Sequence, residues 1–157
     1  MDFLNLEKHK LNFRLMVTPL HEWDEFETVK TEYNLIDATN GGLVLGNPHS
    51  KGGVKFLSPS EDGFRIFEME GFEYLINKKA LNTFEERILT INKYYDPFGF
   101  EEYQPSAKIR VINTFDLYDG RLIILKLSDR QFVVNKYATK KHLEELDYKN
   151  YLGINRM

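Results

Sequence analysis

Short apolar segments that end in an asparagine and continue into an amphipathic stretch occur twice along this chain of 157 residues. In the first copy, segments 63–69 and 73–76 are rich in aromatic and β-branched residues, and Glu70-Gly71 between them suits a tight turn. We therefore expect an antiparallel hairpin. Asn77 follows at the position of a helix N-cap, because its side-chain oxygen can accept from an amide of the next turn.

The stretch after this asparagine has the spacing of a helix that buries one face. Its apolar residues recur three or four positions apart, at Leu81, Phe84, Ile88, Ile91 and Tyr95. The second copy continues from Lys136 to about Leu146 with a weaker pattern, formed by Ala138, His142, Leu143 and Leu146. Both stretches are predicted to be helices that pack against a sheet.

The two copies align without a gap at a constant offset of 58 positions. Tyr74 to Ala80 then lies over Phe132 to Ala138, with Asn, Lys and Ala shared and every apolar position kept apolar. This predicts an α+β fold built of two pseudo-repeated ββα-like units, each an antiparallel hairpin followed by a helix, over 54–95 and 112–152.

Further strand-like segments flank two other turns. Segments 108–113 and 121–127 are joined by a stretch that contains Asp119-Gly120, a pair suited to linking antiparallel strands. A second pair of such segments lies on either side of a glycine-rich turn that carries His49. This histidine is therefore expected on a loop between strands.

The N-terminal part predicts one more helix. Thr18-Pro19 is a suitable start, and one apolar face follows, at Trp23, Phe26, Val29 and Tyr33. The segment 96–105, which links the two copies, is too short and too aromatic for a disordered linker. We therefore expect a single domain over residues 1–157.

Composition narrows the range of functions. The formal net charge of −3 gives no overall attraction to nucleic acid, so no nucleic-acid partner is expected. The chain has no cysteine, which excludes disulfides and thiolate chemistry. No apolar run approaches the roughly 20 residues of a membrane helix, so we expect no membrane association and a soluble protein. Neither a cofactor nor a metal is predicted.

The chemically versatile groups gather at two turns. His49 lies in the glycine-rich turn, and Glu68, Glu70 and Glu73 surround the acidic turn of the first copy. One imidazole and two carboxylates could bind a metal or act as an acid–base pair. Solvated carboxylates beside a tight turn are the other interpretation, and no metalloprotease or nucleophile-elbow motif is present.

The two turns together resemble a module of tailed-bacteriophage proteins, among them tail tape-measure proteins and large phage polyproteins. The residues that carry the resemblance are Gly46, His49, Gly52, Gly53, Val54, Glu70, Gly71, Glu73, Ile76 and Asn77. The resemblance covers about a fifth of the chain and implies a phage origin and a location in the virion or the bacterial host cytoplasm. The chain lacks the long helical body of a tape measure.

The second copy lacks the ionisable groups of the first. His49 aligns with Ala107, Glu70 with Ser128 and Glu73 with Gln131. Either one copy is active and the other degenerate, or the charges are not needed and only the scaffold matters. We favour the scaffold, because packing explains every residue that the copies share.

The favoured function is therefore that of a non-enzymatic structural or assembly component of a tailed-phage particle. Its partners would be other phage structural proteins or a second copy of itself. The expected binding residues are the aromatic side chains around the linking segment, Tyr94, Tyr95, Phe98, Phe100 and Tyr103. Two alternatives stay open: a small peptidase-like hydrolase that uses His49, Glu70 and Glu73, and a phage-encoded modulator that binds a host protein.

Overall fold

A computed structural model describes residues 14–15, 34–60, 63–101, 103–115 and 123–155 of the chain. Within them the fold is mixed α+β, as expected. The elements are β1 (Arg14–Leu15), β2 (Asn34–Asp37), β3 (Gly42–Leu45), the 3-10 helix η2 (His49–Lys51), β4 (Val54–Ser60), β5 (Gly63–Met69), β6 (Tyr74–Ile76), α2 (Lys78–Ile91), β7 (Val111–Asn113), β8 (Ile123–Lys126), β9 (Phe132–Val134) and α3 (Lys136–Asn155). The predicted N-terminal helix, which starts at Thr18, lies outside the described residues.

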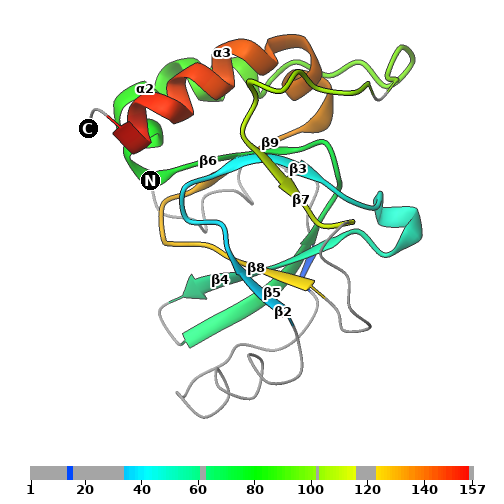
Figure 1. The fold of residues 1–157 in the computed structure, drawn as a ribbon, viewed down its shortest axis with the longest axis vertical. Coiled ribbons are helices and arrows are strands. Elements are labelled where there is room, and N and C mark those ends of the chain that lie inside the picture. The colour runs from blue at the N-terminus through cyan, green and yellow to red at the C-terminus, as the bar shows by residue number, and fades with distance from the viewer. Residues whose placement is uncertain (1–13, 16–33, 61–62, 102, 116–122, 156–157) are drawn as a thin grey trace.

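The described strands form two sheets, and α2 and α3 cover one of them. The first sheet has the order β1-β5-β4-β8-β2, and the second has the order β7-β3-β6-β9. Figure 1 shows α2 and α3 together above the second sheet, with the first sheet beneath it. The second sheet is therefore the middle of three layers. Its strands β3, β6 and β9 are buried, whereas β7 at its edge is partly exposed.

The hairpins predicted from the turn pairs are wrong, although the strands exist. β5 pairs with β1 and β4 in the first sheet, whereas β6 pairs with β3 and β9 in the second. β7 and β8 likewise belong to different sheets, and so do β3 and β4. The antiparallel ladder that does form joins β4 to β5, from Val54 opposite Met69 to Ser60 opposite Gly63.

Burial explains why β6 leaves its predicted partner. Tyr74, Leu75 and Ile76 are all fully buried, so both faces of this strand need a cover. Its place in the second sheet supplies that cover, because α3 packs on β6. Phe72 has a positive φ of 69°, and the turn it makes carries the chain from one sheet to the other.

Both predicted N-caps are confirmed. The side-chain oxygen of Asn77 accepts from the Ala80 amide at 2.9 Å, and that of Asn135 accepts from the Ala138 amide at 2.9 Å. Because these bonds satisfy amides that the helix itself leaves unpaired, they determine where α2 and α3 begin.

The second helix runs well beyond its predicted end near Leu146 and stops at Asn155. Its last turns are buried through Asn150 and Gly153 rather than through large apolar residues, so hydrophobic spacing does not reveal them. Asn150 Oδ1 accepts from the Asn77 backbone amide at 2.8 Å, and a Cβ at Gly153 would overlap the Asn77 side chain.

A single apolar cluster links all three layers. It contains Phe56 and Phe67 from the first sheet, which stack at 5.6 Å between ring centroids, and Leu43 and Leu75 from the second. Leu81 of α2 and Leu146 of α3 belong to the same cluster. Among the described residues, no helix is long and apolar enough to span a membrane.

Candidate functional site

Two glycines allow the histidine loop and the acidic turn to touch. The Gly71 amide donates to the Asn47 carbonyl at 3.0 Å, and a Cβ at Gly71 would overlap the Gly46 backbone. A Cβ at Gly46 would in turn overlap the side chains of Val54 and Thr114. These positions require glycine because backbone and side chains approach too closely for any larger residue.

The imidazole of His49 is paired with Glu68. Nδ1 of His49 lies 2.5 Å from Oε2 of Glu68, whose side chain is only 4% exposed. The other carboxylate oxygen of Glu68 accepts from Lys55 Nζ at 3.1 Å, and the same amino group also donates to the Gly52 carbonyl. A nearly buried carboxylate thus lies between an imidazole nitrogen and an ammonium group, and the ammonium group supplies a counter-charge.

The hydrolase hypothesis names His49, Glu70 and Glu73, and the structure links these three residues through backbone amides. Glu70 Oε1 accepts from the His49 backbone amide at 3.5 Å, not from the imidazole. Glu73 is fully buried, and its carboxylate accepts from the Glu70 amide at 2.6 Å. In the described part of the chain, no group of three metal-ligating side chains is close enough to hold an ion.

The second copy shows what Glu73 does. Gln131, at the aligned position, accepts from the Ser128 amide at 2.6 Å, as Glu73 does from the Glu70 amide. An amide oxygen therefore serves this turn as well as a carboxylate does. The contact supports the turn and does not depend on charge.

The aromatic residues expected to bind a partner divide into two groups. They lie on the connector, residues 92–110 between α2 and β7. Phe98, Tyr95 and Tyr103 are exposed by 97%, 67% and 41% respectively. Tyr94 and Phe100 are partly buried and pack against the core.

Ring contacts anchor the connector. Phe72 of the acidic turn lies 5.3 Å from the Tyr103 ring and 5.8 Å from the Phe100 ring. Tyr137, in the first turn of α3, lies 4.9 Å from the Tyr95 ring and 5.4 Å from the Phe100 ring. All four pairs are edge-to-face, a favourable geometry for aromatic rings.

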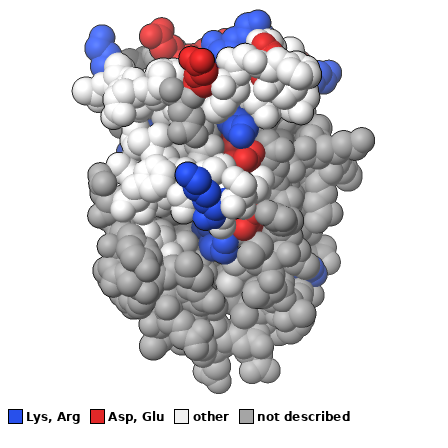
Figure 2. All heavy atoms as spheres, turned by 90° about the vertical axis from the view of Figure 1, so that its right-hand side faces the viewer, with Lys and Arg blue, Asp and Glu red and all other residues white. Residues whose placement is uncertain are grey.

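Lys136 joins the acidic turn to the connector. Its Nζ lies 3.2 Å from Glu70 Oε1 and 5.3 Å from the centroid of the Phe100 ring. Lys140 lies over the rings of Phe100 and Tyr103, at 5.4 and 5.9 Å. Figure 2 shows basic and acidic side chains interspersed down the middle of a face of the molecule beneath the helices. Lys136 therefore adds a second link between the acidic turn and the connector, beside the ring contacts of Phe72, and spacing along the chain reveals neither link.

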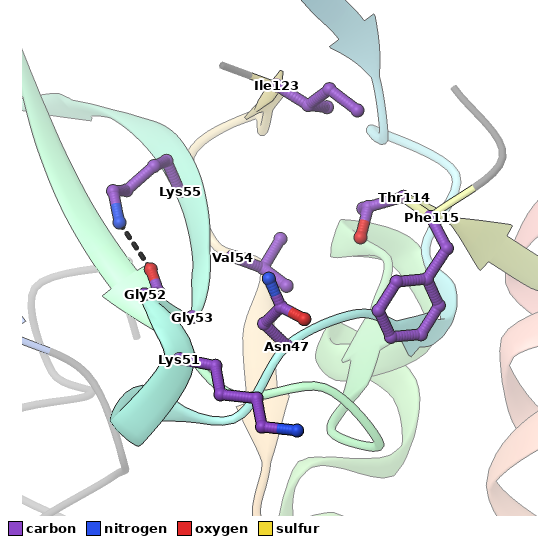
Figure 3. Close-up of a pocket in the computed structure, with 9 residues that line it drawn as sticks. All are labelled: Asn47, Lys51, Gly52, Gly53, Val54, Lys55, Thr114, Phe115 and Ile123. Atoms are coloured by element: carbon purple, nitrogen blue, oxygen red, sulfur yellow. Dashed lines mark hydrogen bonds between the residues drawn. The ribbon is translucent and has the colours of Figure 1, made fainter. Parts of the chain in front are cut away.

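A pocket of about 480 Å³ opens beside the histidine loop (Figure 3). Its walls come from the loop, the start of β4, the end of β7 and the start of β8. The described lining residues are Asn47, Lys51, Gly52, Gly53, Val54, Lys55, Thr114, Phe115 and Ile123. Sequence reasoning missed Phe115, because only the fold brings the end of β7 next to the loop.

No protein-family model matches this chain, and no curated protein or solved structure shows significant similarity to it. The fold and the candidate site therefore describe this protein on their own terms. It is a mixed α+β protein with a histidine loop, an acidic turn and an exposed aromatic connector.

Proposed function

We propose that this chain is a non-enzymatic structural or assembly component that acts through protein–protein contacts. The observation that carries the proposal is the exposure of Phe98, Tyr95 and Tyr103 on one connector. Large exposed aromatic side chains that gather on one segment are enriched at protein interfaces, where they fill pockets of the partner.

The connector is also organised before a partner arrives. Its partly buried rings pack on Phe72 and Tyr137, and Lys136 and Lys140 lie over the Phe100 ring. Because these contacts already restrain the segment, little further conformational entropy is lost on binding. A segment that only covered the core would bury all of its aromatic rings. The connector leaves three of them exposed, which suits a docking surface better.

The phage part of the proposal rests on the resemblance of the motif around His49 and Glu70 to tailed-phage proteins. The partners would then be other structural proteins of the particle or a second copy of the chain, in the virion or in the host cytoplasm.

The experiment is quantitative mass spectrometry of phage particles purified from cells that produce the chain. We expect the wild-type chain at a fixed copy number relative to capsid and tail proteins. A double variant, Tyr95→Ala with Phe98→Ala, should fold normally and be lost from the particle. Tyr151→Ala is the matched control, because this tyrosine is 49% exposed near the C-terminal end of α3 and does not belong to the connector.

Absence of the wild-type chain from purified particles would overturn the virion role. Recovery of the double variant at wild-type abundance would overturn the role of the connector. A stoichiometric complex with one host protein in infected cells, without incorporation into particles, would favour the modulator.

A small hydrolase is the second candidate, and one contact favours it. A carboxylate that holds an imidazole through Nδ1, as Glu68 holds His49 at 2.5 Å, can orient a general base. Incubation with a mixed peptide library followed by mass spectrometry tests this. A hydrolase predicts cleavage that is lost in both His49→Ala and Glu68→Gln and retained in Glu73→Gln.

We also propose that the two units of the fold derive from one duplicated unit. Residues 58 positions apart occupy equivalent places in the two units. Arg87 of α2 and Glu145 of α3 are one such pair, and their side chains form a hydrogen bond with each other. The backbone amide of Asn77 donates to the side-chain oxygen of Asn150, and the backbone amide of Asn135 donates to that of Asn92. Each unit thus ends in an asparagine that bonds the N-cap of the other unit.

Backbone irregularities follow the same spacing. Both helices depart from helical angles once, with φ −117° and ψ 25° at Phe84 and φ −119° and ψ 25° at His142. Positive φ occurs at Phe72 and again at Arg130.

Matched substitutions test the duplication. Asn77→Asp and Asn135→Asp each keep the capping oxygen and lose the side-chain donor to the other unit. We expect similar losses of about 1–3 kcal/mol in the free energy of unfolding. A loss confined to one of the two variants would contradict equivalent roles.

A further inference from the structure

We propose that the pocket beside the histidine loop binds a small anionic compound that carries a flat apolar ring. This site goes beyond the protein contacts of the connector, because none of the aromatic connector residues lines it. Its volume, about 480 Å³, lies within the usual range for small-molecule sites.

The apolar part of the pocket suits a planar ring. Val54 is 3% exposed and Ile123 is partly buried, whereas Phe115 remains 56% exposed to solvent. Leaving so much of a phenyl ring in water is unfavourable, and a flat ligand that stacks on it would remove that surface from solvent.

The charged residues that line the pocket favour a ligand with a negative charge. Lys51 and Lys55 both line it, and no aspartate or glutamate is among its described lining residues. The amino group of Lys55 is already held by Glu68. Lys51 is exposed and forms no ion pair with any residue that the structure describes, so its charge is available to a ligand.

The direction of Lys51 agrees with this role. Figure 3 shows its side chain extending below Asn47 toward the side of the pocket on which Phe115 lies. A cation and an exposed ring on one side of the pocket match a ligand with an anionic group attached to an aromatic body.

The walls are formed before a ligand binds. The Thr114 hydroxyl donates to the Leu45 carbonyl at 2.8 Å, and the Gly53 amide donates to the Pro48 carbonyl at 2.9 Å. Gly46 lets Val54 and Thr114 approach each other where β3 ends. A preformed site of this kind spends little of its binding energy on ordering side chains.

The test compares two fluorescent probes with the same rings, anilinonaphthalene sulfonate and the neutral phenylnaphthylamine, each titrated into the full chain. We expect saturable binding of the sulfonate at one site, with weaker binding of the neutral probe. Lys51→Glu should weaken sulfonate binding about tenfold and leave the neutral probe nearly unchanged. Phe115→Ala should weaken both probes.

Lys93→Glu is the matched control, because Lys93 is exposed just beyond α2 and does not line the pocket. It makes the same change in net charge, so sulfonate affinity should stay within about twofold of wild type. Amide shifts of Lys51, Gly52 and Gly53 on titration locate the site by nuclear magnetic resonance, and near-ultraviolet circular dichroism checks that each variant is folded.

Two results would overturn the proposal. One is absence of saturable sulfonate binding to the wild-type chain. The other is sulfonate binding that Lys51→Glu and Phe115→Ala leave unchanged, because the probe would then lie elsewhere on the surface.

Discussion

At the scale of single residues, burial decides which charged groups are structural. Glu73 is the most buried of the carboxylates that the sequence brings near His49, and its contact is with the Glu70 amide. Gln131 makes the same contact with the Ser128 amide in the second copy. We therefore interpret the Glu73 carboxylate as a hydrogen-bond acceptor that stabilises the turn.

This interpretation predicts the outcome of two substitutions at one position. Glu73→Gln keeps the acceptor and should change the free energy of unfolding by less than about 1 kcal/mol, whereas Glu73→Ala should cost about 1–3 kcal/mol. Urea unfolding measures both, with Glu86→Gln on the exposed side of α2 as the control. Equal losses for the glutamine and alanine variants would mean that the charge itself is required.

Close approach at glycines predicts a second pair of outcomes. A Cβ at Gly71 would overlap the Gly46 backbone, so Gly71→Ala should cost more than about 2 kcal/mol, because two turns would have to separate. At Gly99 the nearest atom to a Cβ is Asp96 Oδ2 at 3.4 Å, so Gly99→Ala should stay within about 0.5 kcal/mol of wild type. Thermal unfolding of the two variants, followed by circular dichroism, provides the comparison.

At the scale of elements, α2 and α3 are joined by an ion pair at their exposed surface. Arg87 donates from Nε and Nη2 to the two carboxylate oxygens of Glu145, at 2.8 Å each, and Lys149 lies 3.1 Å from the same carboxylate. The Arg87 hydrogen bonds are the main reason that the pKa of Glu145 falls from its ordinary value of 4.5 to about 2.

The lowered pKa predicts a dependence of stability on pH. Because the folded state binds the Glu145 proton less readily than the unfolded chain, the ion pair stabilises the fold fully above about pH 4.5. The contribution is lost as the pH falls through about 2. The difference in urea midpoint between wild type and Glu145→Gln should therefore shrink between pH 5 and pH 2.

The control for this experiment is Glu86→Gln, which removes an exposed carboxylate from α2. Its difference from wild type should stay nearly constant over the same pH interval. A Glu145→Gln difference that is equally constant would show that the ion pair contributes nothing to folding.

At the scale of the whole molecule, one apolar cluster connects both sheets and both helices. Phe56 belongs to the first sheet and Leu81 to α2, yet both lie in this cluster and are almost completely buried. Because a shared core couples its parts, we expect a single cooperative unfolding transition, which is also what the single-domain prediction requires.

The cooperativity is tested with one substitution in each region. Phe56→Ala and Leu81→Ala should each cost about 2–5 kcal/mol and shift the same transition. Far- and near-ultraviolet circular dichroism should give coincident curves for both variants. Two separated transitions, with each variant affecting only one, would divide the chain into two domains.

The amino-acid sequence by itself determined the local features of this protein. The caps at Asn77 and Asn135, the start of both helices and the loop position of His49 follow from contacts between neighbours in the chain, so residue type and spacing reveal them. Strand positions were also predictable, because apolar and β-branched residues gather there.

Only the tertiary structure decided how these pieces meet. Strand pairing depends on which surfaces need a cover. All three residues of β6 are buried, so the strand needs a cover on both faces, and it joins the second sheet instead of pairing with β5. The partner of the His49 imidazole, the link from Glu70 through Lys136 to the connector and the place of Phe115 at the pocket are contacts between distant parts of the chain. They arise from the simultaneous packing of three layers, which no local pattern of residues encodes.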